Sequence, residues 1–302
     1  MSDYGHDLLF GTFVTPNART PQRVVDLAVT ADRAGLDLVT FQDHPYQPAL
    51  LDAWTLISYA AARTERIHLA GNVLSLPLRP PATLARAVSS LDRLTGGRIE
   101  LGLGAGAFWD GIAAMGGRRL GAGAGVDALR EAIGIIRDVW DTESPGGVHF
   151  RGDYYVADGV KRGPAPAHDI PIWVGSYKPR MLALTGAHAD GWLPTIEYIE
   201  GGPAAVPGLN ERIDEAAVSA GRSPGDVRRL LNIMNVSLQP ASRGLLDGPA
   251  DQWVEDLAGL TLEHGFSAYL IGGDDPAITE RLGAEIAPAV RELVAAERGV
   301  DV

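Results

Sequence analysis

Hydrophobic and polar positions follow two different periods along this chain of 302 residues. Short apolar runs are each followed by a longer segment in which apolar residues recur every three to four positions, the pattern of strands and amphipathic helices. Strands are predicted at Leu8–Val14, Leu38–Phe41, Ile67–Val73, Ile99–Leu103, Ile172–Val174, Gly191–Leu193, Arg229–Leu238 and Ala268–Ile271. Helices are predicted at Pro21–Ala34, Asp52–Arg63, Pro81–Leu94, Val126–Trp140, Pro179–His188, Asn210–Ala220, Asp251–His264 and Pro276–Ala296.

This regular order of strand and helix predicts an α/β fold of parallel strands, a (β/α)8 TIM barrel, as a single domain over residues 1–302. A doubly wound open sheet is the alternative, but no GxGxxG sequence stands at the first strand–helix turn. Two irregular segments, 104–125 and 146–171, interrupt the pattern. The first is expected to be a loop excursion, and the second contains a predicted hairpin, Val148–Phe150 with Tyr154–Val156.

Composition narrows the class of protein. The formal net charge of −12 argues against a nucleic-acid-binding surface, which needs clustered Lys and Arg. No run of apolar residues is long enough for a membrane span, and the polar start Met1–Asp7 does not resemble a targeting peptide. The absence of cysteine excludes disulfides and thiolate metal sites and fits a cytoplasmic location. A homodimer is expected because dimers are the commonest assembly.

The chemistry of a barrel enzyme lies just after its strands. His44 follows the second strand and suits proton transfer near neutral pH, with Asp43 beside it in sequence. Neighbouring strand residues point to opposite faces, so the two side chains need not bond each other. After the fifth strand, Gly175, Ser176, Tyr177 and Lys178 open a helix and form a candidate phosphate site. Gly272-Gly273 is a weaker candidate, because two aspartates follow it.

Small and aromatic residues follow the fourth strand. Gly104, Gly106 and Ala107 would let a flat ring or a phosphate approach the backbone closely. Phe108 and Trp109, together with Trp192, are expected at the mouth of the pocket. No His, Asp or Glu cluster has a recognised metal spacing and no GxSxG elbow occurs, so no metal is expected and a metal-dependent hydrolase is disfavoured.

Several stretches, in this order and spacing, resemble the luciferase-like monooxygenase superfamily of flavin- and deazaflavin-dependent oxidoreductases. They are Ala34–Asp37, Phe41–His44, Ala62–Val73, Leu91–Gly106, Pro171–Ser176 and Ala187–Trp192. The resemblance covers nearly the whole chain and implies a (β/α)8 barrel with an insertion that covers the active site. It suggests that segments 104–125 and 146–171 shape this lid. It also implies a non-proline cis peptide between Asn72 and Val73, forming a bulge behind the flavin ring.

The resemblance also bears on the cofactor. Asp43-His44 followed by Tyr46-Gln47-Pro48 is similar to the branch that uses coenzyme F-420, which favours an F-420-dependent oxidoreductase acting on a small molecule. It implies cofactor contacts at Asp43, His44, Asn72, Val73, Gly104, Gly106, Ala107, Gly175, Ser176, Tyr177 and Lys178, with proton transfer at His44 assisted by Asp43. Two alternatives stay open. One is a monooxygenase that receives reduced FMN from a reductase, and the other is a flavin-binding carrier without catalysis.

Overall fold

A closed ring of parallel strands forms the centre of the computed structural model, which describes residues 3–300. Around the ring the order is β3-β2-β1-β13-β10-β9-β8-β5, and pairing of β3 with β5 closes it. The strands are β1 (Leu9–Val14), β2 (Leu38–Phe41), β3 (His68–Gly71), β5 (Ile99–Gly104), β8 (Ile172–Val174), β9 (Gly191–Trp192), β10 (Arg228–Ile233) and β13 (Ala268–Gly272). The short β4 (Leu74–Ser75) pairs with the end of β5. The predicted (β/α)8 barrel is therefore confirmed.

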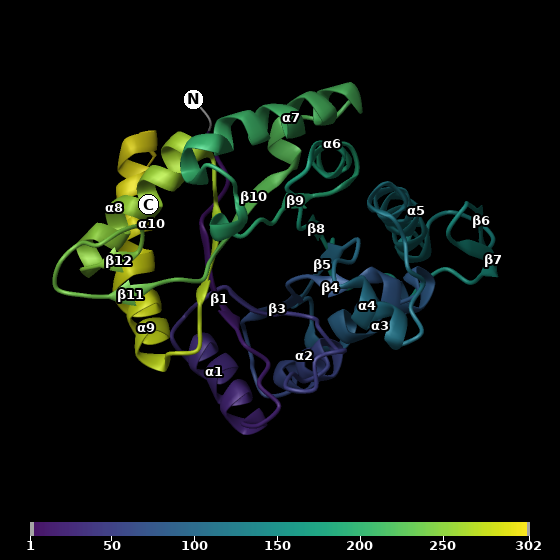
Figure 1. Cartoon of the computed structure of the whole chain (residues 1–302), viewed down its shortest axis with the longest axis horizontal. Coiled ribbons are helices and arrows are strands. Elements are labelled where there is room, and N and C mark those ends of the chain that lie inside the picture. The colour runs from purple at the N-terminus through teal and green to yellow at the C-terminus, as the bar shows by residue number, and fades with distance from the viewer. Residues whose placement is uncertain (1–2, 301–302) are drawn as a thin grey trace.

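Helices surround this ring (Figure 1). They are α1 (Pro21–Arg33), α2 (Ala53–Ala61), α3 (Pro81–Thr95), α5 (Ala122–Trp140), α6 (Pro179–His188), α7 (Val206–Ser219), α8 (Ala250–His264), α9 (Pro276–Arg281) and α10 (Ala287–Arg298). A π-helical turn at Leu282–Ile286 joins α9 to α10, so the last predicted helix is continuous but locally widened. In residues 3–300, no helix combines the length and the apolar character needed to cross a membrane.

Both faces of the strands are buried, as expected for parallel strands covered by helices. One apolar layer fills the inside of the ring and comprises Leu38, Ala70, Trp173, Leu193, Leu230, Ala268 and Leu270. A second and larger layer lies between the strands and the helices. The ring is thus a packed core, and only the loops at its two ends are free to carry chemistry.

The first irregular segment is more ordered than the sequence indicates. It contains the short helix α4 (Trp109–Ala114), and α5 begins at Ala122, before the predicted start at Val126. The residues between are glycine and alanine, whose lack of an apolar period concealed the first turn of the helix. Short 3₁₀ turns lie elsewhere in the connections, at Leu76–Leu78, Ile196–Tyr198, Gly202–Ala205 and Pro224–Asp226.

The second irregular segment carries a hairpin as predicted, formed by antiparallel β6 (Val148–Arg151) and β7 (Val156–Val160), but its second strand begins at Val156, where the predicted Tyr154–Val156 ends. The expectation that this segment lies beside the active site is wrong, because it joins the end of α5 to the start of β8. It protrudes from the side of the molecule beyond α5 (Figure 1). The Glu131 carboxylate of α5 accepts N–H groups from Asp153, Tyr154 and Tyr155, at 2.9–3.0 Å, and so fixes the turn.

One predicted strand is shorter than expected. Arg229–Leu238 was expected as a single strand, but β10 ends at Ile233. The Glu197 carboxylate accepts the N–H groups of Met234 and Asn235, each at 2.8 Å, and turns the chain away from the ring. The chain then forms the small parallel pair β11 (Ser237–Leu238) and β12 (Asp247–Gly248).

Candidate active site at the carboxyl ends of the strands

A bulge separates β3 from β4, and the peptide bond between Asn72 and Val73 at its centre is cis. Two glycines of β5, Gly102 and Gly104, lie directly against this bulge. A Cβ atom on Gly102 would lie 2.2 Å from the Gly71 carbonyl oxygen, and one on Gly104 would lie 2.7 Å from the Val73 side chain. Both positions therefore require glycine. The cis peptide implied by the family resemblance is confirmed, and the bare backbone around Val73 fits a flat ring.

A network of amides and hydroxyls fixes the Asn72 side chain. Its Nδ2 donates to Asn232 Oδ1 at 2.7 Å and to Thr40 Oγ1 at 3.2 Å. Asn232 Nδ2 in turn donates to Asn72 Oδ1 and to Thr195 Oγ1. Asn72 therefore positions the bulge from within the barrel. Sequence reasoning missed Thr40, Asn232 and Thr195, although polar residues at the ends of apolar strands were a signal.

His44 lies half-buried in the loop after β2. Its Nδ1 is 2.6 Å from the Tyr46 hydroxyl, and its ring lies perpendicular to that of Phe108, with 5.2 Å between ring centroids. Burial lowers the pKa of His44, while the charge of Asp43 acts weakly in the opposite direction, so the ring is neutral at neutral pH. Burial also raises the pKa of Tyr46, which keeps its hydroxyl protonated. Because that hydroxyl can donate or accept, His44 Nε2 can carry either a lone pair or a proton.

Asp43 is adjacent in sequence, but its carboxylate is committed elsewhere. The side chain is fully buried and accepts the Ser75 N–H at 2.9 Å and two N–H groups of Arg79 at 2.8 and 2.9 Å. Arg79 also donates to Asp52 at 2.8 Å. The expectation that Asp43 assists catalysis directly is therefore corrected: it is a positioning residue that ties the loop after β2 to the chain after β4. The sequence did not single out Arg79.

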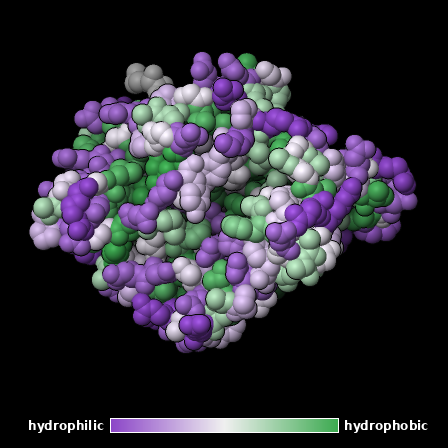
Figure 2. All heavy atoms as spheres, viewed as in Figure 1, coloured by the Kyte–Doolittle hydropathy of each residue, from purple (hydrophilic) through white to green (hydrophobic). Residues whose placement is uncertain are grey.

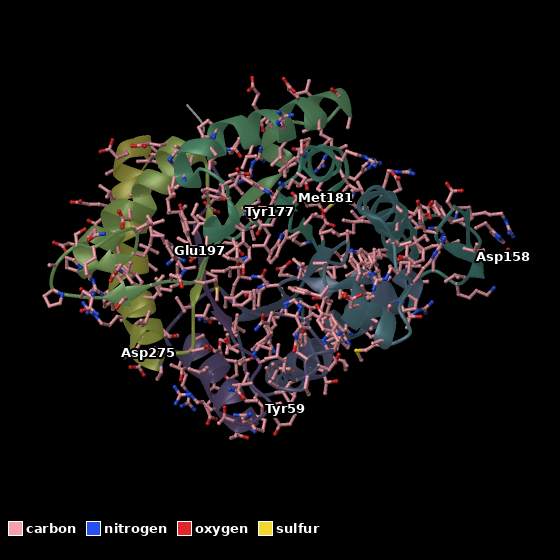
Figure 3. The ribbon with its side chains drawn as sticks, in the orientation of Figure 1. Tyr59, Asp158, Tyr177, Met181, Glu197 and Asp275 are labelled. Atoms are coloured by element: carbon pink, nitrogen blue, oxygen red, sulfur yellow. The ribbon has the colours of Figure 1, made fainter. Side chains whose placement is uncertain are left out.

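The predicted phosphate site is only partly available. The Ser176 side chain is buried, with its hydroxyl 3.0 Å from the Thr185 hydroxyl. The Tyr177 hydroxyl accepts the Thr195 N–H at 2.7 Å (Figure 3 labels Tyr177 near the middle of the molecule). Lys178 is exposed at the start of α6. What remains for an anion is the backbone of Gly175–Lys178 and the Lys178 ammonium, and not the serine hydroxyl.

The aromatic residues expected at the mouth divide into two groups. Phe108 is 57% exposed, next to exposed Ala107, and Trp109 packs against Gly106, whose φ is +98°. Trp192 was wrongly placed there. It is fully buried, stacks on Phe266 with centroids 5.7 Å apart, and donates its indole N–H to the Ser176 carbonyl. Adjacent strand residues face opposite sides, and Trp192 faces the helices.

The helix α4 covers part of this end of the barrel. A Cβ atom on Gly111 would lie 2.6 Å from the Tyr46 ring, so α4 packs directly on the loop that carries His44. Figure 2 shows hydrophilic residues along much of the molecular outline and hydrophobic residues exposed nearer the middle of that face. The bulge, the His44 loop and α4 thus lie together at the carboxyl ends of the strands, the end at which barrel enzymes carry their active sites.

Residues 4–243 match the model of the luciferase-like monooxygenase family, and the chain belongs to that family. One relative is described as an F-420-dependent glucose-6-phosphate dehydrogenase from Amycolatopsis mediterranei (strain U-32). It is 30% identical over 219 residues, which cover 70% of this chain and 64% of the relative. The chain thus matches slightly less than two thirds of that relative's length.

Two further similarities extend over more of the chain. A protein with the same description from Mycolicibacterium fortuitum is 26% identical over 317 residues, covering 95% of this chain and 91% of the relative. Among solved structures, an F-420-dependent secondary alcohol dehydrogenase in complex with an F-420–acetone adduct superposes with a TM-score of 0.81. The two share 19% identity, and the match covers 94% of this chain and 99% of the other, which supports the fold.

Proposed function

We propose that this chain is an oxidoreductase that uses coenzyme F-420 and transfers a hydride between the deazaflavin and a small organic substrate. The observation that carries the proposal is a neutral, half-buried His44 held by Tyr46 at the end of the barrel where the Asn72–Val73 bulge lies. The F-420-dependent relatives in the same family support the choice of cofactor.

The residues around the bulge fit a flat cofactor. Val73 would back the ring, and Gly104, Gly106 and Ala107 would border it through the backbone, since side chains there are small or absent. The Gly175–Lys178 backbone and the Lys178 ammonium would hold the cofactor's phosphate. When bound, the deazaflavin supplies the hydride chemistry, and the protein supplies orientation and electrostatics.

His44 would manage the proton that accompanies hydride transfer. With Nδ1–H donating to the Tyr46 oxygen, Nε2 has a lone pair that can accept a proton from a substrate hydroxyl. With the Tyr46 hydroxyl donating to Nδ1 instead, Nε2 carries the proton. Phe108 and Trp109 would keep water from the site, and we propose segment 104–125 as the lid of a single domain. Segment 146–171 does not share this role, because it leads into the start of β8 at the opposite end of the barrel.

Further parts of the proposal concern the protein's setting. The F-420-dependent reaction needs a second enzyme that restores the cofactor's redox state, so we propose a flavin or F-420 reductase as a functional partner. We also propose a homodimer in the cytoplasm. Light scattering coupled to gel filtration tests the dimer directly, with twice the chain mass of 31.9 kDa expected.

The decisive experiment is a titration of the purified full-length protein with F-420 and, separately, with FMN, followed by cofactor fluorescence. We expect saturable F-420 binding at low micromolar concentration or tighter and much weaker FMN binding. Tight FMN binding without F-420 binding, together with oxygen consumption on reduced FMN, would overturn the assignment in favour of the monooxygenase. F-420 binding with no turnover on alcohol, aldehyde or sugar phosphate panels would favour the carrier.

A further inference from the structure

Three residues far apart in the sequence meet at the opposite, amino-terminal end of the barrel. His68 is the first residue of β3, Glu100 is the second residue of β5, and His168 lies in the connection that precedes β8. Two imidazoles and one carboxylate are thereby gathered so that one ligand atom from each lies within 4.8 Å of the others. The pairing of β3 with β5, which places Ala70 opposite Glu100, brings the first two together.

Glu100 provides a buried carboxylate with spare capacity. The residue is 8% exposed, and one oxygen, Oε1, is 2.8 Å from His68 Nδ1. The other oxygen, Oε2, is buried and has no hydrogen-bond partner among residues 3–300. Arg228 begins β10 at the same end of the barrel, but its guanidinium donates to the Asp7 carbonyl and the Ser267 hydroxyl. An unsatisfied buried carboxylate oxygen is costly and calls for a partner.

The side chain of His168 is held with its Nε2 towards the Glu100 carboxylate. The Asp92 carboxylate, which is fully buried, lies 3.0 Å from His168 Nδ1 and accepts the N–H groups of Ile99, Ala167 and His168. Within the described part of the chain, His168 Nε2 is buried and has no hydrogen-bond partner. It lies 3.6 Å from Glu100 Oε1, too far for a hydrogen bond. A carboxylate behind a histidine, with the far nitrogen left free, is the usual outer arrangement of a metal-bound imidazole.

We propose that His68, Glu100 and His168 bind one divalent transition-metal ion, with Zn²⁺ as the best chemical match. Imidazole nitrogen and carboxylate oxygen are both good zinc ligands, and three protein ligands leave a fourth position for water. The His68 side chain is 38% exposed, so that position can reach solvent.

The charges around the cluster agree with a cation site. The carboxylates of Asp92 and Glu100 lie 3.0 Å and 3.6 Å from the two ring nitrogens of His168. A surface hollow reaches His168 from the outside, and its wall also carries Asp169, Asp190, Arg137 and Arg222. The ion would join β3, β5 and the connection before β8, so its role would be to stabilise the ring at the end away from the chemistry.

The test uses full-length protein without a histidine tag, stripped with a chelator and titrated calorimetrically with ZnCl₂. We expect one ion per chain and a rise in melting temperature that the chelator reverses. His68→Gln should weaken binding by more than the roughly 10- to 100-fold typical of losing only an outer partner of a metal ligand. His149→Gln is the matched control, because His149 also faces a carboxylate, Asp158, at 3.2 Å but lies exposed on the hairpin. It should bind zinc as the wild type does.

Visible absorption of Co²⁺-loaded protein gives a second measure that does not depend on stability. The wild type and His149→Gln should show the intense bands of a low-coordinate cobalt site, and His68→Gln should lose them. Absence of saturable zinc binding in folded wild-type protein would overturn the proposal and leave a metal-free ion-pair cluster. Equal zinc affinity in wild type and His68→Gln would overturn it as well. The proposal is independent of the identity of the cofactor.

Discussion

The two ends of this barrel place histidines in opposite electrostatic settings, although each histidine has a carboxylate close by. At the carboxyl end, the charge of Asp43 is neutralised by Arg79, so burial dominates and lowers the pKa of His44. At the amino end, Glu100 has His68 and His168 as its close neighbours, because Arg228 donates to Asp7 and Ser267 instead. Glu100 and Asp92 together raise the pKa of His168 to about 9. A neighbouring carboxylate therefore raises the pKa of a histidine strongly only when that carboxylate is not already paired with a cation.

The carboxyl end carries the proposed chemistry, and the amino end contributes to stability; substitutions at each end should therefore affect different measured quantities. The largest effect is expected at His44. His44→Ala should lower kcat about 100- to 10,000-fold, the usual contribution of general acid–base catalysis, while F-420 binds within a few-fold of wild type. Steady-state kinetics and cofactor titration measure the two effects. Unchanged turnover would show that the proton is handled elsewhere, and His149→Ala serves as the control.

Breaking the pair behind His44 should cost stability as well as activity. Asp43→Asn removes the buried counter-charge of the partly buried Arg79, so the free energy of unfolding should fall by about 3–5 kcal/mol in urea denaturation. The exposed pair Arg180–Asp127 offers a comparison, since Asp127→Asn should cost less than about 1 kcal/mol. Equal losses for the two variants would mean that Asp43 is not the anchor described above.

At the amino end, a substitution should change stability alone. Arg98 donates to backbone carbonyls of Ala61, Thr64, Ile67 and Thr95 and to the Thr64 hydroxyl, at 2.9–3.2 Å. Arg98→Met should lower the free energy of unfolding by about 2–3 kcal/mol because these carbonyls lose a charged donor, with kcat retained. Arg63→Met is the control, since Arg63 is exposed and donates only a long bond to Tyr59 among the described residues. A large drop in kcat for Arg98→Met would break the division between the two ends.

The smallest effect concerns pH. Folding lowers the pKa of His44 below 6.5, so protonation of its ring opposes folding. The free energy of unfolding should therefore decrease as the pH falls from 6.5 through the lowered pKa. A reaction that uses neutral His44 should keep its kcat/KM down to a pH below 6.5. Phe108→Ala would expose the ring and move the acid limb upward, by less than about one pH unit. An acid limb above 6.5 in wild type would contradict the assigned environment.

Much of the fold follows from periodicity, because alternation of short apolar runs with amphipathic segments leaves few arrangements. The exceptions are local. The strand expected to run to Leu238 ends at Ile233 because a side chain distant in sequence, Glu197, captures the next two N–H groups. The start of α5 was missed because glycine and alanine give no apolar period.

The site was predictable as a set of positions but not as a set of contacts. Placing residues after strands singled out His44, which lies in the loop after β2, and family resemblance supplied the bulge and the cis peptide at Asn72–Val73. The sequence did not reveal that Arg79 pairs with the Asp43 carboxylate or that Trp192 faces the helices. Both facts depend on partners that come together only when the ring closes. The His68–Glu100–His168 cluster has no signature spacing at all, and only three-dimensional structure gathers it.

The most direct test of the central claim is a crystal structure of the full-length protein grown with F-420. The account predicts the deazaflavin ring at the carboxyl ends of the strands, packed on Val73, with His44 at its edge and the phosphate near Lys178. A ring bound elsewhere, or one on Val73 with His44 turned away from it, would contradict the account.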